Sequence, residues 1–201
     1  GVSMGFDLSG ENPKMNMKPE ELPVYHKYEQ MEWKDKWAVL DKDEKVRDKY
    51  WEEQEKFQSA NPGIYFRNNV WWWRPLWQYV CEQFPEIITD EDAENGCSNS
   101  GHLIDEEKAM LIGLGLTAKV LDGSTKAYSD SYKAELDSLE QLECDLCDGT
   151  GTRTDMDVDN GCNGCSGTGL KDDWAKSYPF DVENVRNFAK FCLESGGFTI
   201  C

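Results

Sequence analysis

Four of the eight cysteines occur in two copies of one short motif. Residues 144–151 (CDLCDGTG) and residues 162–169 (CNGCSGTG) both follow the pattern C-x-x-C-x-G-x-G. A C-x-x-C turn directs two thiolates toward one metal ion, and the glycines that follow permit the positive-φ turns that fold the chain back. Two such turns supply the four sulfur ligands of a tetrahedral site, so the spacing predicts one structural zinc ion. The predicted ligands are Cys144, Cys147, Cys162 and Cys165.

The residues alone leave two other interpretations of these cysteines open. Iron is chemically compatible with four thiolates, and the two pairs are alternatively free redox-active thiols in surface loops. A redox C-x-x-C motif normally begins a helix beside a strand, whereas both copies here lie among glycines. A site closed by four thiolates has no open coordination position, so we expect a structural metal and no catalysis at it.

The doubled motif resembles the zinc-binding region of DnaJ-type co-chaperones, in which paired C-x-x-C-x-G-x-G units each hold one zinc ion. The resemblance covers residues 144–169 only, and that family carries four repeats where two stand here. A J-domain also requires a His-Pro-Asp triplet, and neither His26 nor His102 is followed by proline. The resemblance therefore implies the zinc ligands and not chaperone activity.

A second candidate site is the aromatic segment at residues 64–77 (IYFRNNVWWWRPLW). Three consecutive tryptophans point in different directions on a helix or a strand, so at least one faces away from the main core. A buried structural hub explains the tryptophans by themselves. The alternative is a pocket for an anion or a nucleotide, in which aromatic rings stack and arginines pair with phosphate or carboxylate. The residues of this pocket are Arg67, Asn68, Asn69, Trp71, Trp72, Trp73, Arg74 and Trp77.

Two weaker candidates lie elsewhere in the sequence. Residues 155–161 (DMDVDNG) are similar to part of a calcium-binding loop, but Asn160 stands where such a loop requires glycine. A solvated acidic tip is the preferred interpretation. Residues 96–102 (GCSNSGH) bring Cys97 near His102, which suits a thiol nucleophile with a base, or a second metal site. The sequence identifies no third catalytic group beside this pair.

The net charge of the chain excludes some classes of binding partner. Asp and Glu number 39 against 21 Lys and Arg, for a formal net charge of −18, and the basic residues are scattered among acidic ones. Phosphate backbones and anionic membrane surfaces require clustered positive charge. We therefore expect no non-specific nucleic-acid binding and no membrane binding. No apolar run is long enough to cross a bilayer and no signal peptide is evident, so we expect a cytoplasmic protein.

The elements that must position these residues are mostly helical. A short strand is expected at Phe6–Leu8 and another at residues 198–201. Hydrophobic spacing predicts a helix that ends before Asn61, and a second helix with Pro75 in its first turn. Three further helices are expected to start at Asp105, Ser124 and Asp181, whose side chains would cap them. On the helix after Ser124 one stripe is formed by Tyr128, Tyr132, Leu136, Leu139 and Leu142.

The predicted fold class is mainly α (α+β): a helical domain with short terminal strands and a small zinc-knuckle insert. Cys81 and Cys192 lie on apolar helical stripes and are expected in the core. The expected organisation has a tag remnant (1–3), a helical core (4–143) with a charge-dense insertion (27–60), the zinc-knuckle module (144–169), and a C-terminal helix and strand that complete the core (170–201).

Three blocks of sequence resemble a family of small uncharacterised proteins of tailed bacteriophages. The blocks are residues 4–8 with Asn12 and Pro13, residues 65–77 (YFRNNVWWWRPLW), and residues 183–198. The resemblance implies a setting, the cytoplasm of an infected bacterium, more than a mechanism. Proteins in that setting often bind host factors or small signalling molecules.

Three classes of function follow from these observations. The preferred one is a non-enzymatic, zinc-stabilised phage accessory protein that binds a host protein or a small anionic ligand. An acidic, DNA-mimic-like inhibitor of a host protein is an alternative that rests on the net charge. A metal- or thiol-dependent enzyme is the other alternative, and only Cys97 and His102 would supply its chemistry.

Overall fold

The computed structural model describes residues 4–153 and 161–201. Its centre is an antiparallel sheet with the strand order β2-β1-β6-β3. The strands are β1 (Gly5–Gly10), β2 (Tyr65–Asn69), β3 (His102–Ile104) and β6 (Phe198–Ile200). Leu8 lies opposite Phe66 on one side and Ile200 on the other, so the two strands expected near the ends of the chain pair directly. Strands β2 and β3 were not expected from the sequence.

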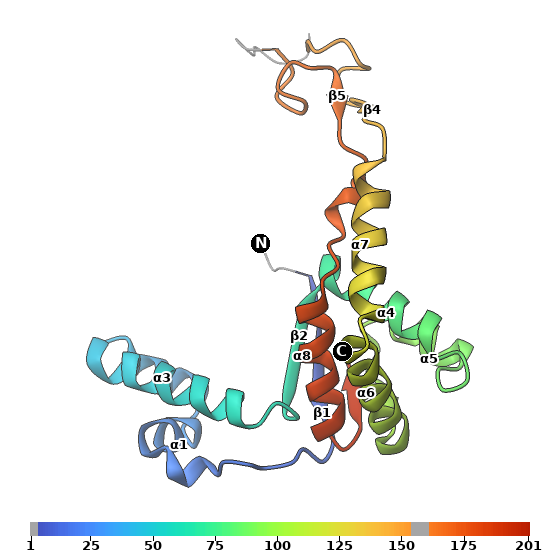
Figure 1. Cartoon of the computed structure of the whole chain (residues 1–201). Coiled ribbons are helices and arrows are strands. Elements are labelled where there is room, and N and C mark those ends of the chain that lie inside the picture. Colours follow the sequence, from blue (N-terminus) through green and yellow to red (C-terminus); the bar gives the residue numbers. More distant parts are fainter. Residues whose placement is uncertain (1–3, 154–160) are drawn as a thin grey trace.

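Helices α4 (Val70–Gln83), α6 (Glu106–Leu121) and α8 (Val182–Glu194) pack with this sheet to form the main core (Figure 1). A side chain at Gly113 of α6 would meet Leu193 at 2.8 Å, so the glycine lets α6 and α8 pack closely. Cys192 is buried and Cys81 packs against the core, as expected. The most deeply buried side chains of the core include Trp73, Leu76, Trp77, Tyr79, Ile104, Ile112, Phe188, Phe191 and Phe198.

Two of the three predicted caps are confirmed. The side chain of Asp105 accepts from the N–H of Lys108 at 2.8 Å, and Asp181 caps α8 in the same way. The expected Ser124 cap is wrong: Ser124 is the first residue of α7 (Ser124–Asp137), because Gly123 takes the capping position with φ +87°.

The predicted position of Pro75 in the first turn of its helix is wrong. Helix α4 begins at Val70, because the side chain of Asn69 accepts from the N–H of Trp72 at 3.1 Å. Pro75 therefore sits inside the helix, where its missing N–H removes one backbone hydrogen bond.

Residues 19–60 form a helical arm that projects from the main body (Figure 1). It contains the 3-10 turn η1 (Pro19–Glu21) and helices α1 (Pro23–Glu29), α2 (Trp33–Leu40) and α3 (Glu44–Ala60). The helix predicted before Asn61 is α3, and Asp43 caps it. A separate small hydrophobic cluster, with Tyr28, Leu40 and Tyr50 at its centre, holds the arm together.

The remaining elements lead to the cysteine motifs. Helix α5 (Asp90–Asn95) follows α4, and α7 runs outward from the body to the short ladder β4 (Leu142–Glu143) and β5 (Leu170–Lys171) (Figure 1). The chain returns alongside α7 through the 3-10 turn η2 (Trp174–Ser177). The described residues thus form a mainly α fold with a small antiparallel sheet and a small cysteine-bearing insert, which confirms the predicted fold class.

Candidate functional site

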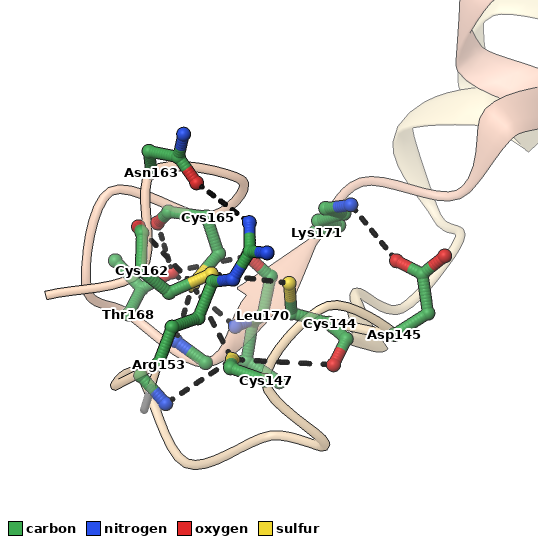
Figure 2. Close-up of polar contacts among 12 residues, drawn as sticks. Cys144, Asp145, Cys147, Arg153, Cys162, Asn163, Cys165, Thr168, Leu170 and Lys171 are labelled. Carbon is green, nitrogen blue, oxygen red and sulfur yellow. Dashed lines mark hydrogen bonds and ion pairs between the residues drawn. The ribbon is translucent and has the colours of Figure 1, made fainter. Parts of the chain in front are cut away.

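The four motif cysteines lie together at the outer end of α7, on the far side of the β4–β5 ladder (Figures 1 and 2). All four side chains are buried, and their sulfur atoms lie within 4.8 Å of one another. The distance between the sulfurs of Cys144 and Cys162 is 3.9 Å, and that between Cys147 and Cys165 is 3.8 Å. A tetrahedral site with metal–sulfur bonds of about 2.3 Å has sulfur–sulfur edges of about 3.8 Å. The arrangement therefore fits a metal ion bound by four thiolates.

The two motifs adopt the same backbone conformation and exchange hydrogen bonds. The N–H of Cys144 donates to the carbonyl of Gly169 at 2.8 Å, and the N–H of Cys162 donates to the carbonyl of Gly151, also at 2.8 Å. Within each motif the threonine hydroxyl donates to the carbonyl of the second cysteine, at 2.7 Å for both Thr150 and Thr168. The sequence repeat is thus a repeat in structure, with approximate two-fold symmetry about the sulfur cluster.

The last glycine of each motif is required at the contact between the two motifs. Gly151 has φ +79°, and a Cβ there would stand 2.5 Å from the carbonyl oxygen of Gly167. Gly169 has φ +76°, and its Cβ would stand 2.3 Å from the carbonyl oxygen of Gly149. A side chain at either position would combine a left-handed backbone with a backbone clash. This explains why both motifs end in glycine.

Backbone donors stabilise negative charge on the sulfurs. The N–H of Gly151 donates to the sulfur of Cys147 at 3.3 Å, and the N–H of Gly169 donates to the sulfur of Cys165 at 3.2 Å. Desolvation opposes ionisation of Cys165, but the Gly169 donor and the neighbouring thiols lower its pKa to about 6. Thiolate is the form that binds a metal. Desolvation raises the pKa of the partner thiol Cys162.

The segment that is similar to a calcium loop, residues 155–161, lies almost wholly outside the described residues, which resume at Gly161. At the edge of the module an ion pair of 2.8 Å joins Lys171 to Asp145 across the β4–β5 ladder (Figure 2).

The aromatic segment is divided between two elements. On β2, Arg67 pairs with Asp7 of β1 at 3.3 Å, and the amides of Asn68 and Asn184 exchange two hydrogen bonds of 3.0 and 2.8 Å. Asn69 caps α4. Each of these three polar side chains therefore has a structural partner.

On α4 the tryptophans separate into buried and surface residues. Trp73 and Trp77 are buried and stack at 5.4 Å between ring centroids, and the indole N–H of Trp73 donates to the carbonyl of Gly96 at 2.8 Å. Trp72 is half-buried. Trp71 is exposed and contacts Tyr178, with 4.9 Å between the two ring centroids. The structure thus places a hub and a surface in one segment, and it does not bring Arg67 and Arg74 to one pocket.

Arg74 lies at the edge of a groove that sequence reasoning missed. The groove has a volume of about 630 Å³ and lies between α4, α7 and η2. The Arg74 guanidinium donates to the Tyr178 hydroxyl at 3.1 Å, and no carboxylate among the described residues pairs with it. Tyr128, Tyr132, Leu136 and Leu139 of the predicted stripe line the opposite wall. The stripe does not extend to Leu142 as predicted, because α7 ends at Asp137 and Leu142 lies on β4. The lining residues are Arg74, Pro75, Gln78, Glu82, Tyr128, Tyr132, Glu135, Leu136, Leu139, Trp174, Ala175 and Tyr178.

His102 has a partner that the sequence did not reveal. Its Nε2 lies 2.8 Å from a carboxylate oxygen of Asp92, and the other oxygen accepts from Lys108 at 2.6 Å. Burial alone would raise the pKa of Asp92, but these two partners and Thr89 lower it to about 2. Desolvation raises the pKa of the Cys97 thiol. A thiol that ionises less readily than usual is a poor nucleophile.

Comparison of the chain with protein-family models, curated proteins and solved structures finds no match. Across residues 4–153 and 161–201, no helix is both long and apolar enough to cross a bilayer.

Proposed function

We propose that the four thiolates bind one zinc ion, which stabilises the fold and takes no part in catalysis. The support is the tetrahedral spacing of the sulfurs, their burial, and the N–H donors aimed at Cys147 and Cys165. Zinc has no redox chemistry and favours four thiolates in a closed site. Bound there, it would supply a cross-link between the two motifs.

The place of this cross-link in the chain indicates what it stabilises. Ladder β4–β5 joins the end of α7 to the start of η2, and these two segments form two walls of the groove. Strand β5 ends at Lys171, three positions before Trp174. A metal ion that fixes the ladder therefore fixes the spacing of the groove walls. The proposed function rests on this connection between the cysteine cluster and the walls of the groove.

We infer that the protein is a non-enzymatic, zinc-stabilised binding module for a small anionic ligand or a host protein. Arg74 favours a small anionic ligand. Although the chain has a net charge of −18, this arginine has no carboxylate partner among the described residues, and it lines an aromatic groove. Burial raises the pKa of Cys97, and among the described residues no hydrogen bond joins its thiol to His102, so a thiol enzyme is not favoured. The phage setting, with a site of action in the host cytoplasm, rests on the three sequence blocks.

Native mass spectrometry of the purified protein tests this function, because it weighs bound metal and co-purified small molecules together. We expect one zinc ion per chain and its loss in Cys144→Ser. Cys97→Ser is the matched control, because Cys97 is exposed and outside the cluster, and it should retain the metal. A wild-type protein that carries no metal after expression with zinc would refute the proposal.

A further inference from the structure

The groove between α4, α7 and η2 has charged groups of opposite sign at its two ends. On α4, Arg74 and Glu82 both line it and are eight residues apart, which is about 12 Å along a helix axis. Arg74 contacts Tyr178, whereas Glu82 lies near Tyr128, so the guanidinium and the carboxylate belong to different ends. Glu135 on the opposite wall lies near Tyr132, whose hydroxyl donates to the carbonyl of Tyr178 at 2.7 Å, so this second carboxylate belongs to the Arg74 half of the groove. The groove is therefore polar along its length.

Aromatic side chains form the walls between these ends. Trp174 is 68 % exposed and makes a T-shaped contact with Tyr178, with 5.6 Å between ring centroids and an interplanar angle of 77°. Tyr128 and Tyr132 stack at 6.2 Å on α7. Burial and the Glu82 carboxylate raise the pKa of Tyr128 to about 12, so its phenol stays protonated at neutral pH. A large indole held at the rim of a groove offers a free face to a planar ligand.

We propose that this groove binds a nucleoside monophosphate, with its single phosphate at Arg74, its base between Trp174 and the tyrosines, and its amino edge toward Glu82. The inference rests on the proposed binding function and names its ligand class. Arginine pairs with phosphate through two parallel N–H donors, and carboxylates accept from exocyclic amines. A volume of about 630 Å³ lies within the range of small-molecule sites.

Charge selects one phosphate rather than three. A single guanidinium meets the phosphate, while two carboxylates in the groove and the net charge of −18 repel additional negative groups. Each further phosphate therefore adds repulsion without a new partner. Bases that carry an exocyclic amine, as in AMP, GMP and CMP, can donate to the Glu82 carboxylate, whereas the uracil of UMP presents no amine.

Isothermal titration calorimetry of the zinc-loaded, full-length protein with AMP, GMP, CMP, UMP and ATP tests this assignment. We expect at least one of the three amine-bearing monophosphates to bind more tightly than UMP. We also expect AMP to bind more tightly than ATP. Arg74→Gln should weaken the binding of that nucleotide by about tenfold or more, since hydrogen bonds to charged groups are among the strongest. Trp174→Ala should weaken it by a similar factor through lost stacking.

Two control variants match the changes in charge and in exposed aromatic surface. Arg47→Gln removes one positive charge from α3, and Trp33→Ala removes an indole that is 70 % exposed on α2. Both residues lie on the helical arm, so these variants should bind the nucleotide as the wild type does. Equal losses in the control and groove variants would overturn the assignment.

The same titration separates the two proposals. A zinc-loaded protein that binds none of the monophosphates at millimolar concentration would refute the nucleotide site and leave the zinc-stabilised module in place. A protein that carries no zinc would refute the module itself, and metal analysis of each sample reads this out independently of the heat of binding.

Discussion

Removal of the metal should unfold the cysteine module and leave the main core folded. Among the described residues of the module, the buried cluster consists of the four cysteines alone, so protein contacts contribute little to its stability. None of the described residues between 142 and 171 belongs to the main core. The β4–β5 ladder pairs only two residues with two. On the proposed function, we therefore expect a bound metal to supply most of the stability of this part of the chain.

The expected magnitude follows from the size of the loop and the ligand set. A cross-link between Cys144 and Cys165 encloses about 20 residues, for which loop closure alone is worth about 3 kcal/mol. Structural zinc in small four-ligand modules contributes about 10–16 kcal/mol of apparent binding free energy at pH 7. Either figure exceeds what a two-residue ladder supplies, so the module should open completely without the ion.

Hydrogen exchange measured by mass spectrometry, with and without a zinc chelator, checks this prediction. Peptides from residues 142–153 and 161–171 should lose protection at the shortest labelling time, and η2 should lose it in part. Peptides from α4 and α8 should keep theirs, since their contacts lie in the core. Cys144→Ser should reproduce the chelated pattern, and Cys97→Ser should not.

Two results would refute this reasoning. Retained protection of the module after chelation would mean that protein contacts hold it. Simultaneous exposure of α4 and α8 would mean that the metal supports the whole fold instead of one end of it.

Two further predictions concern single side chains. Gly151→Ala should weaken zinc retention and destabilise the module more than Gly123→Ala destabilises α7, because both positions have positive φ but only the first adds a clash, 2.5 Å from Gly167; competition with a chromogenic chelator and hydrogen exchange measure the difference. Asp92→Asn should cost about 2 kcal/mol at pH 7, from a pKa of about 2 against an ordinary 3.8. Because the pKa of Asp92 is depressed in the folded state, its carboxylate stabilises the fold fully above pH 3.8, and this stabilisation is lost as the pH falls toward 2. The urea unfolding curves of variant and wild type should therefore converge in that range.

Local features could be predicted from the sequence, and long-range ones could not. The caps at Asp105 and Asp181 and the cysteine turns depend on neighbours within a few positions, and the structure has them as predicted. Strand β2 was missed because its outward residues are polar and its inward ones are few. Strand β3 has only three residues and follows a glycine-rich loop. Neither shows the alternation that identifies a strand.

The groove illustrates the same limit at the level of function. Its walls come from Arg74, Tyr132 and Trp174, which are far apart in the sequence and meet only because the chain returns alongside α7. The stripe on α7 was visible, but hydrophobic spacing does not distinguish a face that contacts a core from one that lines a groove. The arginine, by contrast, was identified from its type and its aromatic neighbours.

On the proposed function, the groove accounts for a metal site that lies at a distance from it. A residue that offers an exposed face to a ligand, as we propose for Trp174, cannot also be buried to hold its segment in place. Helix α7 contacts the core through Tyr128, which meets Tyr79 and Phe180, and through Tyr132, which also meets Phe180. Its outer half and η2 need another constraint, and a four-thiolate cross-link provides one without apolar area. On the proposed function, the cysteine cluster can therefore lie apart from the groove and still fix the spacing of its walls.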